Sequence, residues 1–200
     1  MKRFFIGKLS VKKQQRIVIA GTQRGVGVTH FALALANVAA ARERRSTLYM
    51  EVGQQGNIVS LRTKDTFAID GLIGFRREGV AFLPHVPTED ACAVFSDPRW
   101  DVIICDVTEN DRTEVLVAAS TSCLLLADVK PWHYTVFQQS MKEWMWERNK
   151  KRASLLSLHM RKQDEKRCRR EFGTSIEALP FIADPFSMTY DEAAQAARFL

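Results

Sequence analysis

A glycine-rich turn between an apolar run and a helical pattern constrains the fold of this chain more than any other feature. The apolar run Ile17–Ala20 predicts a buried strand. After the turn, apolar residues recur on one face of a helix at Phe31, Leu35 and Val38. Between the two lies Gly21–His30, which reads Gly-Thr-Gln-Arg-Gly-Val-Gly-Val-Thr-His. In this setting the backbone N–H groups of the turn and the helix N-terminus can hold an anion without a charged side chain.

The turn has the outline of the phosphate-binding pattern G-x-x-x-x-G-K-[ST], but it lacks the lysine. Gly27 and Thr29 stand at the sixth and eighth positions of the pattern. Val28 stands at the lysine position, and Thr22 at the first glycine. The sequence therefore keeps the glycine-rich shape and the hydroxyl that binds Mg²⁺, and it loses the charge of the loop.

Two later segments indicate which kind of loop this is. Residues 47–57 form an apolar strand that runs into Glu-Val-Gly-Gln-Gln-Gly-Asn, and residues 100–106 form a second strand that ends in Asp106. In order and spacing, the turn and these segments resemble the MinD/ParA (SIMIBI) family of P-loop ATPases, in which the strand matching residues 47–57 runs into Asp-x-Asp-x-Gln-Gly-Asn. The resemblance places Glu51 at the first aspartate and Gly53 at the second. Asp106 then corresponds to the Walker-B-type aspartate.

The resemblance extends over roughly residues 14–186. Residues 123–131 are similar to the next core strand of the family and the loop after it, and residues 177–181 to a late strand that ends in a proline, here Pro180. The run Val129–Trp132 is similar to the TadZ/CpaE-like branch of pilus-assembly and secretion positioning proteins. The resemblance implies an α/β fold of the P-loop NTPase kind, with a single doubly wound, mostly parallel sheet and helices on both faces.

The alternation of strand and helix patterns favours the same fold class. Short apolar runs between helical patterns are typical of a parallel sheet that is covered on both faces, in which ligands bind outside the carboxyl ends of the strands. Between Asn57 and Val80 the pattern is poor, and this region looks shortened relative to the family. The predicted strands are residues 16–20, 47–51, 79–83, 102–106, 122–127, 153–159 and 176–181. The predicted helices are residues 29–44, 112–120, 131–148, 161–172 and 189–199.

The resemblance implies that ATP or ADP with Mg²⁺ would bind along the carboxyl edge of the sheet. Thr29 and Asp106 would then hold the Mg²⁺. The candidate nucleotide-binding residues are Thr22, Gln23, Arg24, Gly25, Val26, Gly27, Val28, Thr29, His30, Glu51, Asp106 and Pro180. No catalytic residue is assigned.

Three charged groups of the family are missing from this chain. Val28 replaces the lysine that neutralises phosphate charge, and Gln23 replaces the lysine that reaches a partner subunit's nucleotide. Gly53 replaces the aspartate that orients the attacking water. One charge-assisted phosphate contact is worth about 1.5–3 kcal/mol, so three losses argue against efficient hydrolysis. We therefore expect a pseudo-ATPase that binds nucleotide weakly, with the Val28 side chain turned away from the phosphates or packed on its neighbours. The alternatives are an active ATPase that uses Arg24, and a bare strand–helix connection that binds nothing.

Composition predicts one domain in a cytoplasmic protein. Two hundred residues with 46% hydrophobic residues suffice for one core, which we assign to residues 16–200 after a basic segment at 1–15. No apolar run approaches the roughly 18 residues of a membrane span, and the N-terminus lacks the features of a secretory signal. The four cysteines show no C-x-x-C spacing, which favours buried, reduced thiols.

The charge is uneven, with a formal net charge of +6. Basic residues gather in residues 1–16 and 148–170, and ParA-like relatives use basic surfaces to hold DNA. A solvated helix face is the simpler explanation, so we expect only weak, non-specific DNA binding. The C-terminal residues 191–200 are nearly neutral and lack the basic amphipathic helix of MinD-like relatives. We therefore expect no membrane contact.

A protein partner is the interaction that the sequence favours most. The predicted helix 131–148 carries an apolar stripe that faces the core, and part of its aromatic surface, with Trp132, Trp144 and Trp146, is available to a partner. A homodimer is a further alternative. The overall interpretation is a degenerate MinD/ParA-like localisation or assembly factor of the pilus, secretion or partition type. A basic nucleic-acid-binding module is the competing function.

Overall fold

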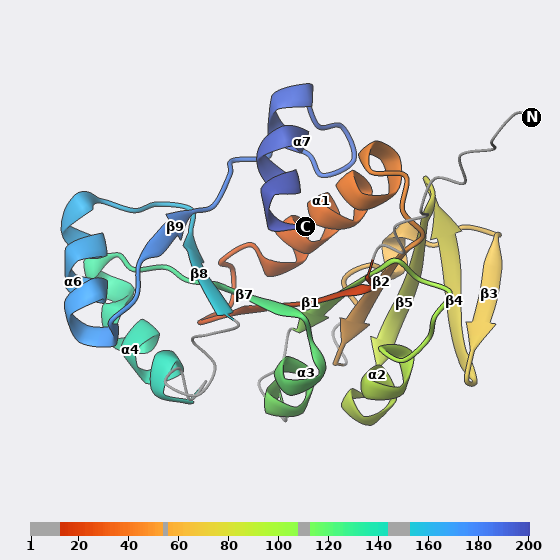
Figure 1. Cartoon of the computed structure of the whole chain (residues 1–200), viewed down its shortest axis with the longest axis horizontal. Helices are drawn as coiled ribbons and strands as arrows, with labels where there is room; N and C mark the ends of the chain where they lie inside the picture. The colour runs from red at the N-terminus through yellow and green to blue at the C-terminus, as the bar shows by residue number, and fades with distance from the viewer. Residues whose placement is uncertain (1–12, 54–55, 108–112, 144–152) are drawn as a thin grey trace, which may run out of the picture.

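The computed structural model describes residues 13–53, 56–107, 113–143 and 153–200. These residues form one nine-stranded sheet with helices on both faces, as Figure 1 shows. The strands are β1 (Gln15–Gly21), β2 (Thr47–Val52), β3 (Thr66–Ile69), β4 (Leu72–Arg77), β5 (Val80–Val86), β6 (Val102–Val107), β7 (Ser122–Leu126), β8 (Ala153–Ser157) and β9 (Ile176–Ala178). The predicted fold class, a single and mostly parallel α/β sheet, is confirmed.

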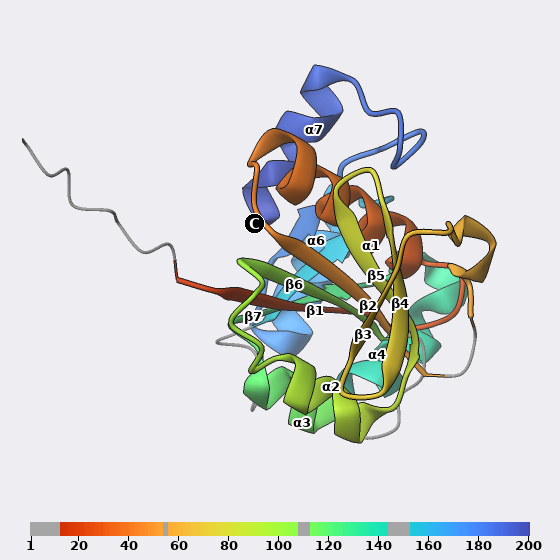
Figure 2. The same ribbon diagram turned by 90° about the vertical axis from the view of Figure 1, so that its right-hand side faces the viewer.

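The strand order is β3-β4-β5-β2-β6-β1-β7-β8-β9. All neighbours from β5 to β9 are parallel, whereas β3 and β4 form an antiparallel hairpin beside β5 (Figure 2). The chain leaves β1 toward β2 on one side and later adds β7 on the other side. The carboxyl end of β1 therefore lies where connections diverge, which is where open α/β sheets bind their ligands.

Helices cover the two faces of the sheet in two separate layers (Figure 1). One layer contains α1 (Val28–Asn37), its π-helical continuation η1 (Val38–Arg42), α7 (Tyr190–Ala196) and η4 (Ala197–Phe199). The other layer contains α2 (Thr88–Val94), α3 (Thr113–Ala119), α4 (Tyr134–Glu143) and α6 (Lys162–Phe172). Two short 3₁₀ turns, η2 (Val59–Leu61) and η3 (Pro131–His133), lie in the connections.

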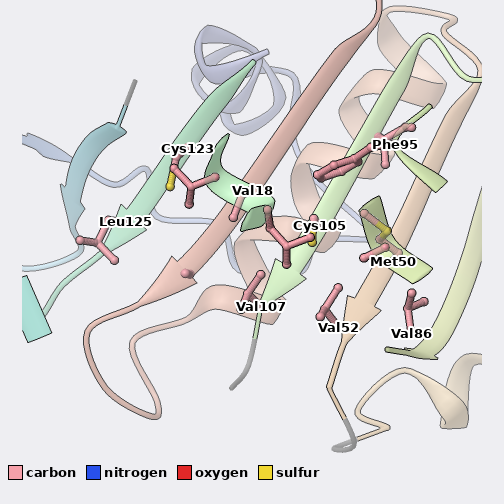
Figure 3. Close-up of a cluster of buried hydrophobic side chains, with 14 of the residues drawn as sticks. Val18, Met50, Val52, Val86, Phe95, Cys105, Val107, Cys123 and Leu125 are labelled. Carbon is pink, nitrogen blue, oxygen red and sulfur yellow. The ribbon is translucent and has the colours of Figure 1, made fainter. Parts of the chain in front are cut away.

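The strands in the centre of the sheet are buried on both sides because each face is covered. Figure 3 shows one of the two cores, in which Val18, Met50 and Cys105 from three neighbouring strands meet Phe95. Such strands read as continuous apolar runs, which is why their positions could be predicted. Three of the four cysteines are buried, Cys92 is partly exposed, and all four are free thiols.

The other face of the sheet leads to the candidate site. Ile19, Tyr49 and Ile104 are fully buried in the core beneath α1. Side chains along a strand alternate between faces, so Glu51 and Asp106 lie on this same face, two residues further along their strands. Both residues stand next to last in their strands, at the carboxyl edge of the sheet.

All seven predicted strands are present, and the predicted helices match apart from their ends. The strands β3 and β4 and the helix α2 were not predicted. The two-residue turn between β3 and β4 is Asp70-Gly71, with φ angles of 48° and 85°, and such a pair is a strong hairpin signal. The predicted helix 131–148 is described only as far as Glu143, and Trp144, Trp146 and residues 1–12 of the basic N-terminal segment lie outside the described ranges.

Candidate functional site

The loop between β1 and α1 is open on the side of its glycines. Gly25 and Gly27 have φ angles of 81° and 95°, and among the described residues no atom beyond their chain neighbours lies within 4 Å of the position where a Cβ would stand on either. Gly27 is the N-cap of α1, no side chain caps the helix, and its first turn contains no acidic residue. The first N–H groups of a helix have no partner within the helix, and they carry its positive end. The loop therefore has the backbone geometry of an anion site.

The residue at the lysine position packs into the protein. Val26 and Val28 contact the apolar core beneath α1. A Cβ on Gly21 would come within 2.7 Å of a Val26 methyl group and 2.8 Å of a Val28 methyl group. The two valines therefore lie against the backbone at the end of β1, where only glycine leaves room for them.

The first part of the loop is fixed to its surroundings. The Thr22 N–H donates to the Leu126 carbonyl of β7 at 2.9 Å. The Thr22 carbonyl in turn accepts a hydrogen bond of 2.5 Å from the Ser140 hydroxyl of α4, in a buried position. The loop thus begins on a rigid base formed by β7 and α4, and only its glycine-rich part faces outward.

Gln23 contacts its own chain. Its side-chain nitrogen lies 3.2 Å from Nδ1 of His133, and that ring nitrogen lies 2.7 Å from a carboxylate oxygen of Asp128. Partial burial raises the pKa of Asp128, but the hydrogen bond with His133 and the charge of Lys130 bring it below its ordinary value. The contact with His133 holds the Gln23 side chain beside η3.

Glu51 and Asp106 form a buried pair of carboxylates beside the loop. They are direct partners in the register of β2 and β6, and both are fully buried. One oxygen of Glu51 accepts the backbone N–H of Asn57 at 2.8 Å. Oε2 of Glu51 and Oδ1 of Asp106 are buried and have no hydrogen-bond partner among the residues that the structure describes. Buried carboxylate oxygens without a partner are costly, which fits a site that is completed by a cation.

Tyr49, two residues before Glu51 on β2, contacts the Asp106 carboxylate. Its hydroxyl donates to Oδ2 of Asp106 at 2.6 Å. Burial, with a smaller contribution from the charge of Glu51, raises the pKa of Asp106 to about 6, although hydrogen bonds from Tyr49 and Thr29 favour the carboxylate. Burial and the two carboxylates raise the pKa of Tyr49 well above its ordinary value. The Thr29 hydroxyl, at the start of α1, therefore lies beside Asp106, as a shared Mg²⁺ site requires.

The remaining predicted site residues lie around the open side of the loop. Arg24 is exposed. His30 is exposed too, and its Nε2 lies 2.8 Å from the Ile182 carbonyl, so its ring is directed toward the C-terminal segment. Pro180 is half-buried just before that contact, and Phe181 beside it is 73% exposed. The His30 contact thus brings the segment after β9 next to the start of α1.

Sequence reasoning missed three residues that support the site. Tyr49 could have been found, because it precedes Glu51 by two residues and so shares its face of the strand. Ser140 and His133 could not, because each meets the loop from more than 100 residues away along the chain. Only the folded arrangement of α4 and η3 brings them to Thr22 and Gln23.

Comparisons with known proteins identify the fold. No model of a known protein family matches the chain, and no curated protein sequence matches it. Several solved structures match over nearly the whole chain. A plasmid partition protein of Borrelia burgdorferi B31 bound to AMPPNP has a TM-score of 0.62 and 14% identity, over 94% of this chain and 97% of its own. A chain of the MinC:MinD cell division protein complex of Aquifex aeolicus also matches, with a TM-score of 0.59 and 15% identity. The match covers 91% of this chain and 86% of the other.

A third match is cobyrinic acid a,c-diamide synthase of Mycobacterium smegmatis with bound ADP and magnesium. It has a TM-score of 0.58 and 14% identity, and the match covers 92% of this chain and 91% of the synthase chain. The resemblance to MinD/ParA-type proteins is therefore confirmed for the fold. At these identities the likeness extends to the fold alone.

Proposed function

We propose that this chain binds a nucleoside di- or triphosphate with Mg²⁺ weakly at the Gly21–Thr29 loop, and that it acts by binding and not by hydrolysis. The observation that carries the proposal is the uncapped start of α1, with Gly25 and Gly27 open beside it and Asp106 buried next to Thr29. Matched structures of the same fold contain AMPPNP in one case and ADP with magnesium in another.

Each part of the loop has a role in this proposal. The N–H groups from Gly25 to Thr29 would hold the phosphates through backbone dipoles and the positive end of α1. The Thr29 hydroxyl and Asp106 would hold the Mg²⁺, which neutralises phosphate charge when it is bound. The residues present fit such an ion, because Oδ1 of Asp106 is buried and has no hydrogen-bond partner in the described part of the chain. Pro180 and its neighbours border the site next to His30.

The same geometry argues against efficient hydrolysis. Val28 packs on Gly21 and the core and brings no charge to the phosphates. Gln23 is neutral and contacts His133. Gly53 has no side chain with which to orient a water molecule. Phosphoryl transfer depends on positioning and charge neutralisation. A site without the two lysines and the aspartate of the family should therefore lose hydrolysis to a greater extent than it loses nucleotide binding.

An assay of phosphate release tests this distinction. We expect no Mg²⁺-dependent ATP or GTP hydrolysis above background from the purified chain, alone or with DNA or lipid vesicles. The competing function is an ATPase in which the exposed Arg24 supplies the missing charge. Turnover that disappears on Thr29→Ala or Asp106→Ala would contradict the proposal, and its loss on Arg24→Ala but not on Arg44→Ala would establish the competing function.

We further propose that the chain works as a localisation or assembly factor with a protein partner. Trp132 is 67% exposed and Val136 is 47% exposed, and they lie one helical turn apart on η3 and α4. Exposed aromatic residues of this kind are enriched at protein interfaces. A homodimer is one arrangement that this surface allows, and sedimentation with and without nucleotide measures it.

A nucleic-acid-binding function is the second candidate, and one feature of α6 favours it. Lys162, Lys166 and Arg170 are exposed and spaced by four residues, so they share one face of the helix. No ion pair joins them to another residue in the described part of the chain. We expect weak DNA binding that falls steeply with salt. Tight binding at physiological salt that is lost when these three residues become Glu would favour this function over the first.

A further inference from the structure

We propose that a second copy of this chain pairs with the outer edge of β3, so that the two sheets join across a symmetry axis. This goes beyond the proposed function, in which a partner meets η3 and α4, and it does not depend on nucleotide binding. β3 is the last strand on its side of the sheet, as Figure 1 shows. The free edge of a strand presents a row of N–H and C=O groups with which another strand can pair.

The backbone groups that β3 turns outward belong to Thr66 and Ala68. The Arg76 N–H donates to the Asp65 carbonyl at 2.8 Å, so the backbone of Asp65 faces β4. Alternate residues of an antiparallel strand face its neighbour, and Thr66 and Ala68, one and three residues further along, therefore face away. In the described part of the chain, no backbone hydrogen bond outside the β3–β4 ladder involves either residue.

The side chains of β3 leave this edge open to another strand. Thr66 and Ala68 are small and exposed. The Phe67 ring lies over Gly74 of β4, since a Cβ on that glycine would come within 2.5 Å of the ring, and Ile69 is buried. The strand contains no charged residue and no proline, although both commonly prevent the edges of sheets from pairing.

The opposite edge of the sheet does contain such residues. β9 has three residues, its central residue is the exposed Glu177, and Pro180 follows two residues after the strand. A strand that approached β9 would meet a charged side chain and then a proline, which has no N–H. Of the two edges of the sheet, β3 is therefore the one that can accept another strand.

Charge complementarity favours a second copy as the partner. In an antiparallel pair centred on Phe67, Thr66 of one copy lies opposite Ala68 of the other, so the outward N–H and C=O groups of both residues meet. The same register brings Lys64 of each copy opposite Asp70 of the other. Lys64 and Asp70 are exposed, and the ion pairs of the described residues involve neither of them. One register therefore satisfies both the backbone groups and the charges.

The interface is small, so the association should be weak. The two Thr66–Ala68 pairs form about four hydrogen bonds between the copies. Two paired segments of about seven residues bury less surface than the roughly 1,200 Å² of a stable, specific interface. We therefore expect a dissociation constant on the order of 100 μM.

Self-association of the purified chain without nucleotide tests the proposal. Sedimentation over a range from about 5 to about 500 μM should show a monomer that becomes a dimer. Between about 50 and about 1,000 μM, amide exchange with water, measured by NMR, should slow by about threefold at Thr66 and Ala68. It should not change at Phe67, whose N–H faces β4.

A proline in the strand tests the backbone pairing. Ala68→Pro removes an outward N–H and should abolish the dimer, and the ladder to β4 should remain because that N–H is not part of it. Ala68→Ser keeps the N–H, so it is the matched control and should dimerise as wild type does.

A charge reversal tests the register and does not alter the strand. Lys64→Glu places like charges opposite each other in both halves of the dimer, and it should weaken dimerisation by about threefold or more at low salt. Lys166→Glu makes the same change at an exposed position on α6 and should have no effect. Because Lys64 is exposed and lies outside the strand, this variant keeps the test valid should Ala68→Pro fail to fold.

Three results would overturn the proposal. The first is a chain that stays monomeric to about 500 μM. The second is a dimer that forms equally well in Ala68→Pro and Lys64→Glu, because the contact would then lie on another surface, such as the one with Trp132 and Val136. The third is slower exchange at Thr66 and Ala68 only when an extended peptide of alternating Thr and Val is added, which would assign the edge to a strand of another protein. No measurement uses nucleotide, so a failure of the proposed nucleotide function would leave these outcomes unchanged.

Discussion

The glycine-rich loop and the Glu51–Asp106 pair lie at the same edge of the sheet, yet they contribute different features to the proposed nucleotide site. The loop keeps its shape, with open glycines and an uncapped helix, and it has no charged side chain at the lysine position. The pair keeps its charge, in two fully buried carboxylates with an unpartnered oxygen each. The loop between β1 and α1 therefore supplies the shape of the site, and β2 and β6 supply its negative charge. Substitutions in one region can test its contribution without a change in the other.

The difference also lies in what each region contributes to stability. Val26 and Val28 of the loop pack on the core, so the loop adds apolar contact. The Asp106 carboxylate is buried, and burial of the charged form without an ion pair weakens the fold. The packing of the loop thus adds to stability, whereas the buried charge of Asp106 lowers it.

The largest expected effect concerns the charge of Asp106 in the protein without metal. Burial raises the pKa of this carboxyl group from 3.8 to about 6, so the folded protein binds the proton more tightly than the unfolded chain does. Stability from this group is therefore highest at low pH and falls as the pH rises from about 4 to about 6. In EDTA at pH 7.5, Asp106→Asn should raise the free energy of unfolding by up to about 3 kcal/mol.

Urea unfolding at pH 7.5, 6.0 and 4.5 measures this effect, and the gain should shrink toward the lowest pH. Asn keeps an acceptor for the Tyr49 hydroxyl, so the change isolates the charge. The exposed Asp90→Asn on α2 is the control and should change stability by no more than about 0.5 kcal/mol. A variant that is less stable than wild type in EDTA at pH 7.5 would show that the buried charge does not weaken the fold.

The second prediction concerns the shape of the loop. Gly21→Ala places a methyl group 2.7 Å from Val26 and 2.8 Å from Val28, and 3.1 Å from the Gln23 carbonyl. This crowding should lower the free energy of unfolding by about 1–3 kcal/mol. A double-mutant cycle with Val28→Ala measures the coupling, because the smaller residue removes one of the two contacts. Additive effects of the two changes would mean that Val28 does not pack over Gly21.

These predictions rest partly on features that sequence reasoning could reach and partly on ones it could not. The central strands were predictable because burial on both faces makes them continuous apolar runs, as at Ile17–Ala20. The order of the loop, Glu51 and Asp106 along the sheet edge followed from the parallel topology. The hairpin of β3 and β4 was missed although Asp70-Gly71 marks its turn.

The contacts that hold the site were beyond the reach of local patterns. The His133 and Ser140 side chains meet the loop through the packing of η3 and α4 against β7, which no local pattern specifies. The inward packing of Val28 was expected from its apolar character, but its contact with Gly21 depends on the backbone path of the loop. The contacts that fix the loop therefore depend on packing between residues far apart in the sequence.

A smaller effect is expected where α4 supports the loop. Ser140→Ala removes the buried hydrogen bond to the Thr22 carbonyl and should lower the free energy of unfolding by about 1 kcal/mol. Ser60→Ala, in the exposed η2 turn, is the control with the same chemical change and should have no measurable effect. Equal stability of both variants in urea unfolding would show that the loop does not depend on this contact.

The most direct test of the account is the affinity of the loop for nucleotide with and without a lysine. Calorimetry with ADP or ATP and Mg²⁺ should give a dissociation constant for wild type that is in the high-micromolar range or weaker, on the order of 100 μM or more. Val28→Lys restores one charged phosphate contact and should tighten binding by about tenfold or more. If neither protein binds nucleotide measurably, the loop is only a connection between β1 and α1, and the central claim is wrong.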